Sequence, residues 1–162
     1  MDALQHVPLT AFFAKAGLAA GTTTTTTTSN GATFHYCIKG KAYQATGASN
    51  GATPTTDAVT GAAFTAIGLN KAGVFVFCYD TSGALKVVQG TIVDYNDSGV
   101  FWNGAPQFPT IPDTLCPIGY ELVKVISTGS AWTMGSSNQA AQTGITKVFV
   151  DCVTLPERPQ TS

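Results

Sequence analysis

Apolar residues recur at every second position from Phe34 through Tyr36 to Ile38, which is the period of a β-strand with one buried face. The pattern predicts a strand over residues 33–39 and a second over 41–45, joined at Gly40. The two strands are expected to form a hairpin.

Residues 74–79 are apolar on both faces, which is typical of the central strand of a sandwich or barrel. Asp80 opens and Gly83 closes a four-residue turn into a partner strand at 84–93. Further strands are expected at 120–127 and 145–153, and four prolines between residues 103 and 117 predict a stiff, irregular loop. The expected fold is mainly β, an antiparallel β-sandwich or barrel-like domain with an extended N-terminal arm and long loops.

The first 28 residues lack a pattern that could bury them on a core. Pro8 and Gly17 limit any helix to about two turns. Seven consecutive threonines at 22–28 favour an extended chain but offer no apolar face. We therefore expect an N-terminal arm at 1–28 that a partner holds, a β domain at 29–154 and a C-terminal tail at 155–162.

Composition and charge exclude several functions. Charged residues make up 10% of the chain, against about 25% in ordinary soluble proteins. The eight basic residues are scattered and the net charge is −1, so nucleic-acid binding is not expected. No apolar run is long enough to span a bilayer. The chain starts with an acidic residue rather than basic ones, and Pro8 and Lys15 interrupt the apolar stretch that follows. Both features argue against a secretory signal and for a chain made in a cytoplasm.

Candidate catalytic or metal-binding groups are few. The four cysteines lie about forty residues apart, which favours buried thiols over a zinc or redox motif and leaves two disulfides as the alternative. His35 has no nucleophile motif around it. Residues 94–99 resemble the opening of a calcium loop, but Ala105 stands where the closing acid belongs. We expect no enzyme activity, no metal and no cofactor.

Trp102 lies in Gly- and Asn-rich surroundings, where an aromatic side chain can pack internally, anchor a protein interface or stack on a sugar. The sequence leaves these three roles open.

The order of features in segments 12–21, 54–57 and 109–120 resembles that of small virion structural proteins of tailed bacteriophages. The resemblance implies a non-enzymatic protein that decorates or cements the capsid, located on the capsid surface of the virion and assembled in the host cytoplasm. The implied partners are the major capsid protein and further copies of the chain, with a trimer favoured, and neither nucleic acid nor membrane.

The residues expected to contact these partners are the apolar positions of the arm, alternate threonines and one tryptophan. They are Leu4, Val7, Leu9, Phe12, Phe13, Thr22, Thr24, Thr26, Thr28 and Trp102. The alternative function is a receptor-binding or fibre-associated virion module that binds host glycans through Trp102, Tyr95 and the polar loops.

Overall fold

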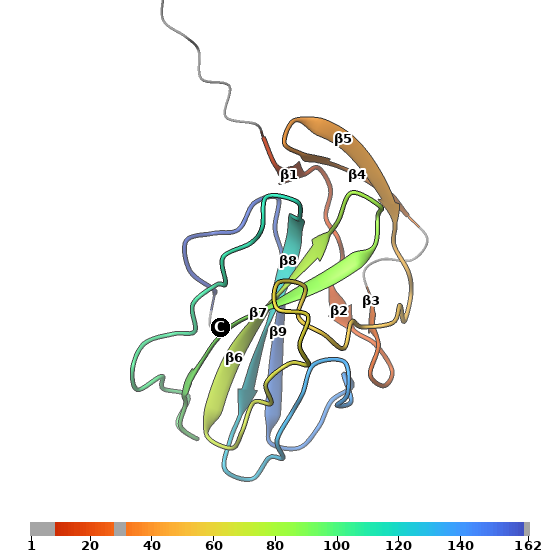
Figure 1. Cartoon of the computed structure of the whole chain (residues 1–162). Helices are drawn as coiled ribbons and strands as arrows, with labels where there is room; N and C mark the ends of the chain where they lie inside the picture. The colour runs from red at the N-terminus through yellow and green to blue at the C-terminus, as the bar shows by residue number, and fades with distance from the viewer. Residues whose placement is uncertain (1–8, 28–31, 161–162) are drawn as a thin grey trace, which may run out of the picture.

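The computed structural model describes residues 9–27 and 32–160, which form antiparallel β-strands and no helix (Figure 1). The mainly β, sandwich-like class is confirmed. A three-stranded sheet has the order β1-β4-β5, a two-stranded sheet pairs β2 with β3, and a four-stranded sheet has the order β7-β6-β8-β9. The strands are β1 (Ala11–Phe12), β2 (Ala19–Ala20), β3 (Thr26–Thr27), β4 (Thr33–Ile38), β5 (Lys41–Thr46), β6 (Lys71–Tyr79), β7 (Leu85–Asp94), β8 (Cys116–Val125) and β9 (Ile145–Asp151).

Strand β6 lies inside the larger sheet, as its apolar sequence predicts. Every residue from Ala72 to Tyr79 is buried. Phe75 and Phe77 face one hydrophobic core, whereas Val74 and Val76 face another on the opposite side. The predicted turn after β6 is also present, because Gly83 has a φ of 81° and the Asp80 carboxylate accepts the Ser82 amide at 2.8 Å.

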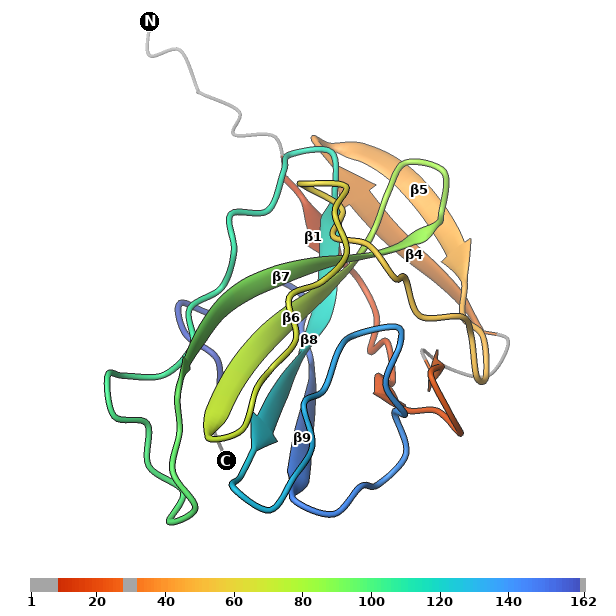
Figure 2. The same ribbon diagram turned by 60° about the horizontal axis from the view of Figure 1, so that its bottom comes forward.

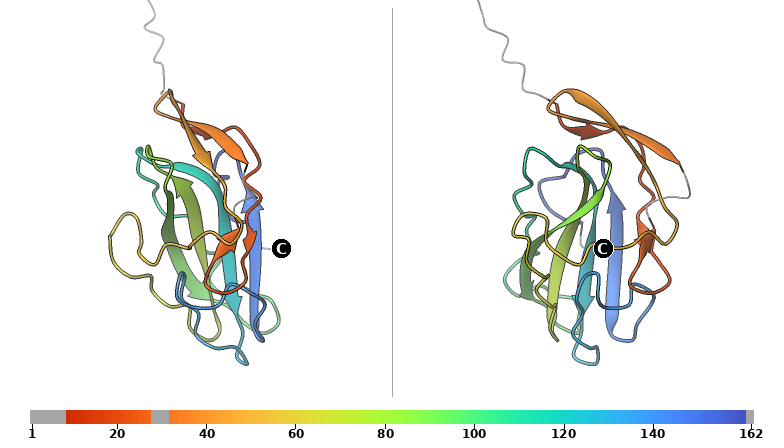
Figure 3. Two further views of the ribbon diagram at one scale, coloured as in Figure 1. Left: turned by 90° about the vertical axis from the view of Figure 1, so that its right-hand side faces the viewer. Right: turned by 45° about the vertical axis from the view of Figure 1, so that its right-hand side comes forward.

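Irregular segments cover both faces of the four-stranded sheet. Phe64 from the segment between β5 and β6 packs edge-on against Phe75, and that segment stands out on one side of the sheet (Figure 3). Phe75 also meets Trp132, from the segment between β8 and β9. On the opposite face, Phe108 packs against Tyr120 at 4.9 Å between ring centroids. The expected irregular loop is found before β8, but Pro117 lies within β8, beside a register shift that accommodates a residue without a backbone donor.

The three-stranded sheet lies across one end of the larger sheet (Figure 2). Aromatic rings join the two sheets there. The Tyr36 ring stacks on Tyr79 with centroids 5.7 Å apart, and Phe12 lies 6.2 Å from the same ring. The Tyr36 hydroxyl also donates a 2.6 Å hydrogen bond to the carbonyl of Asp80. These contacts join the N-terminal strands to the central core.

The expected separate arm differs from the structure over residues 9–27, which belong to the domain. Phe12 is 0% exposed and its strand pairs with β4. Thr26 is 0% exposed as well, and its hydroxyl hydrogen-bonds the Thr53 hydroxyl at 2.9 Å. The buried Thr26 hydroxyl thus has a partner, which offsets the cost of burying it, whereas the buried Thr25 hydroxyl has none among the described residues. No boundary separates residues 9–27 from the domain.

The expected C-terminal tail is likewise attached to the domain over its described part. Leu155 packs against the second core, and the Gln160 amide donates to the Tyr120 hydroxyl at 2.7 Å.

The burial of Phe77 generates a test of the central strand. Because the ring is 0% exposed, Phe77→Ala should lower the free energy of unfolding by about 3 to 5 kcal/mol in a urea titration. Val59→Ala, at an exposed apolar position, is the control and should change it by less than about 0.5 kcal/mol. A Phe77→Ala loss below about 1 kcal/mol would contradict a fully packed β6.

Candidate functional site

The structure divides the expected partner-contact residues into three groups. Leu9, Phe13 and Trp102 are exposed, by 56%, 57% and 71%. Phe12 and Thr26 are buried, so they are corrected to residues of the fold. The remaining positions are an exposed Thr22, a half-buried Thr24, and Leu4, Val7 and Thr28, which lie outside the described residues.

Phe13 lies next to another exposed apolar residue, Val153, which the sequence pattern did not single out, and the exposed Leu9 lies four residues before Phe13 in the chain. The Phe12 amide donates to the Val153 carbonyl at 3.1 Å, and the Phe13 amide donates to the backbone carbonyl of His35 on β4, also at 3.1 Å. Phe13 and Val153 line one pocket of about 400 Å³. We call Leu9, Phe13 and Val153 the apolar rim. The two amide hydrogen bonds hold the backbone at Phe13 and Val153, so these side chains project from an ordered part of the fold.

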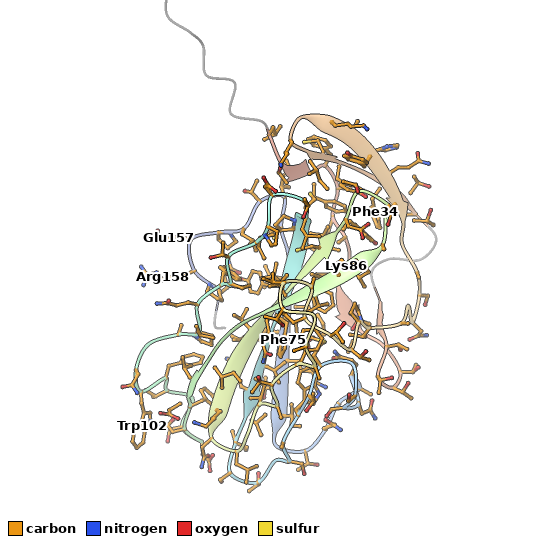
Figure 4. All side chains as sticks on the ribbon, viewed as in Figure 1. Phe34, Phe75, Lys86, Trp102, Glu157 and Arg158 are labelled. Atoms are coloured by element: carbon orange, nitrogen blue, oxygen red, sulfur yellow. The ribbon has the colours of Figure 1, made fainter. Side chains whose placement is uncertain are left out.

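Trp102 lies at the periphery of the molecule, well away from the central Phe75 (Figure 4). It borders a second pocket of about 490 Å³. Segments far apart in sequence build this pocket, because Asn70 precedes β6 and Ser127 follows β8. No local pattern pointed to these two residues. We call the site the Trp102 pocket, and it is lined by Asn70, Asp94, Tyr95, Asn96, Asp97, Ser98, Trp102 and Ser127.

The side-chain oxygens of the loop that resembles a calcium site bind protein groups. The Asp94 carboxylate pairs with the Lys71 ammonium at 2.7 Å. The Asn96 side-chain carbonyl accepts the amides of Ser98 and Val100, at 3.0 and 2.8 Å. Within the described residues, no group of three or more His, Cys, Asp and Glu side chains could hold a metal ion. The side-chain oxygens of Asp94 and Asn96 are therefore already bonded to protein groups.

A cavity of about 710 Å³ is lined by two carboxylates, Asp57 and Asp80. Desolvation opposes ionisation of Asp57, but backbone amides of Gln89, Thr60 and Val59 outweigh it and lower the pKa. Desolvation also opposes ionisation of Asp80, and bonds from Ser82 and Ala84 outweigh it and lower its pKa. Both acids are therefore ionised near neutral pH, and neither suits the role of a general acid there.

Three of the thiols, those of Cys78, Cys116 and Cys152, are poor nucleophiles, because burial keeps them protonated. Desolvation raises the pKa of Cys116 to about 12 and that of Cys152 to about 11, and it raises that of Cys78 well above its usual range. All four cysteines are free in the structure. A thiol must ionise to attack a substrate, so the thiols of Cys78, Cys116 and Cys152 suit packing rather than covalent chemistry.

Glu121 is the carboxyl group with the most altered acidity. Desolvation raises its pKa to about 8, and the Gln139 amide nitrogen donates a 3.2 Å bond to its Oε2. The Lys147 ammonium does not pair with it; it donates to the carbonyls of Asn138, Gln139 and Ala140, at 2.8, 3.1 and 3.2 Å. Oε1 of Glu121 and Oε1 of Gln139 have no hydrogen-bond partner among the described residues. A protonated carboxyl carries an O–H donor, which suits a buried site with unpartnered acceptor oxygens.

A strongly shifted pKa marks catalytic groups when they line a cleft. Glu121 is 0% exposed, and Gln139, which donates to it, also contacts the buried Met134. It lines none of the pockets described above. Glu121 therefore does not meet that condition.

Comparison with protein-family models, with curated proteins and with solved structures finds no match. Among the described residues, none forms a helix that could span a membrane. Functional inference therefore depends on the two exposed sites.

The buried acid predicts how stability depends on pH. The unfolded chain loses the Glu121 proton near the ordinary pKa of 4.5, whereas the folded chain keeps it until about 8. The stabilisation is thus complete below about pH 4.5 and is lost as the pH rises to about 8, by up to about 1.4 kcal/mol per pH unit. Urea titrations across this window should show that decline in the wild type and its absence in Glu121→Gln, because a carboxamide does not ionise.

Glu157→Gln, which changes the only other glutamate and an exposed one, is the matched control and should keep the wild-type slope. Parallel curves for the wild type and Glu121→Gln would show that the carboxyl is not protonated in the fold.

Proposed function

We propose that this protein is a non-enzymatic structural protein that attaches to the surface of a larger assembly through the apolar rim. The assembly that fits the sequence resemblance is the capsid of a tailed bacteriophage. In this proposal the protein decorates or cements the shell by bridging subunits of the major capsid protein, and copies of the chain associate, with a trimer favoured.

The exposure of Leu9, Phe13 and Val153 is the observation that supports attachment. Each is more than half exposed, although the fold buries large apolar residues throughout two cores. Phe13 and Val153 line one pocket, and contiguous exposed apolar patches mark surfaces that another protein covers. Covering them removes apolar area from water, which favours association.

Backbone bonds make the rim suitable for docking. Phe13 is fixed to β4, and Val153 is fixed to Phe12, by the amide hydrogen bonds described above. A surface that is already ordered loses little conformational entropy when it binds. This differs from the extended, partner-held arm that the sequence suggested, since the anchor Phe13 is held by the domain and Phe12 is inside it.

Sparse charge agrees with a protein that covers a shell in many copies. With a net charge of −1, neighbouring copies repel each other only weakly. Many weak contacts on one shell also act together, because each bound copy raises the effective concentration of the next contact.

Replacement of the rim aromatic tests the proposal. Phe13→Ser should lower binding by about tenfold or more, because an apolar anchor is lost. Binding is measured as occupancy on capsids of the phage that carries the protein, or as self-association in sedimentation velocity. The thermal unfolding midpoint should stay within a few degrees of the wild-type value, since the ring is 57% exposed.

Val59→Ser, at an apolar position of similar exposure outside the rim, is the matched control and should attach like the wild type. Equal loss in both variants would point to general surface stickiness. A wild-type protein that neither binds such capsids nor self-associates would overturn the proposal.

A further inference from the structure

The Trp102 pocket has features that attachment through the apolar rim does not explain. Trp102 is 71% exposed, the largest exposure among the large apolar side chains described. Its neighbour Phe101 instead packs inward on Tyr95, with ring centroids 5.1 Å apart. The fold thus uses one aromatic of this pair for packing and leaves the other on the surface.

The backbone holds Trp102 in place. Its amide donates to the carbonyl of Asp94 at 3.3 Å, and Tyr95 and Phe101 form an antiparallel bridge inside this contact. The Asp97 side chain ties the loop to the segment after β8, because its carboxylate accepts hydrogen bonds from the Ser127 amide, at 2.8 Å, and from the Ser127 hydroxyl. The Trp102 backbone is therefore fixed, and its exposed indole borders the pocket.

The polar groups of the pocket keep capacity to bind a ligand. Each Asp97 carboxylate oxygen receives one bond from Ser127 and can accept another. The Asn96 side chain uses its carbonyl within the loop, which leaves the amide nitrogen as a donor. Acceptors and a donor thus lie next to one apolar ring.

A saccharide matches this combination. A pyranose ring has an apolar face of C–H groups that stacks on an aromatic ring, and its rim of hydroxyls both donates and accepts hydrogen bonds. The pocket volume of about 490 Å³ lies within the usual range for small-molecule sites, about 300 to 1,000 Å³.

The charges around the pocket select the kind of saccharide. Asp94 and Asp97 contribute two carboxylates, and the nearby Lys71 ammonium is already paired with Asp94. Lys124 lies over the Tyr95 and Phe101 rings, 5.8 and 5.9 Å from their centroids. The lining itself carries two carboxylates and no cation that could pair with an acidic sugar, which disfavours sialic acids, uronic acids and sulfated sugars.

We propose that the Trp102 pocket binds a neutral saccharide, with the sugar ring stacked on Trp102 and its hydroxyls bonded to Asp97 and Asn96. The site is separate from the apolar rim, so the protein can carry both functions. It would give an attached protein a surface that recognises glycans.

Intrinsic fluorescence provides a selective test, because the second tryptophan, Trp132, is 0% exposed. The full-length protein is titrated with glucose, galactose, mannose and N-acetylglucosamine, with their neutral oligosaccharides, and with sialyllactose. At least one neutral sugar should give a saturable change in emission, confirmed by calorimetry, and sialyllactose should bind at least about tenfold more weakly.

Two variants locate the binding. In calorimetry, Trp102→Ala should weaken the neutral sugar by about tenfold or more, whereas Phe13→Ala, at an exposed aromatic of the rim, should bind it like the wild type. Attachment to capsids should show the opposite dependence, so failure of one proposal is distinguishable from failure of the other.

The proposal is overturned if no neutral saccharide binds, if Trp102→Ala binds equally well, or if sialyllactose binds best. Loss of protein attachment in Trp102→Ala without sugar binding would assign Trp102 to a protein interface instead.

Discussion

The fold depends on keeping both faces of β6 and β8 away from water. An antiparallel sheet often leaves one face wet, but these strands carry large apolar side chains on both faces. Within the described residues no helix is available to cover them, so long irregular segments provide Phe64 and Trp132 on one face and Phe108 on the other. Much of the chain outside the strands thus acts as a cover for the sheet.

This constraint also explains where function can lie. Side chains that do not cover the sheet are exposed, and neighbours in sequence can differ in burial. Phe12 is buried whereas Phe13 is exposed, and Phe101 packs on Tyr95 whereas Trp102 is exposed. The covering segments also bury a polar group, since Gln139 donates to the fully buried Glu121 and desolvation raises the pKa of that carboxyl to about 8. The apolar rim and the Trp102 pocket are therefore products of the same packing that stabilises the sheet.

Local pattern predicted the strands at 33–45 and the central position of 74–79, because period-two alternation and a two-sided apolar run are visible over six or more residues. Strand β1 has two residues, too few to show a period, so nothing local distinguished Phe12 from Phe13. Glu121 interrupts an apolar strand as an exposed residue would, and only its cover makes it buried. Asn70 and Ser127 meet at the pocket through the sheet, which no spacing reveals.

The central claim is that the N-terminal strands and the four-stranded sheet form one cooperative unit, joined by Phe12, Tyr36 and Tyr79. Native-state hydrogen exchange of the full-length protein tests this most directly. Amides in the middle of β4, such as that of Tyr36, should exchange with the same free energy as those of β6, equal to the free energy of global unfolding. Exchange of β4 at a free energy lower by several kcal/mol, with β6 still protected, would contradict the account and show a separable N-terminal part.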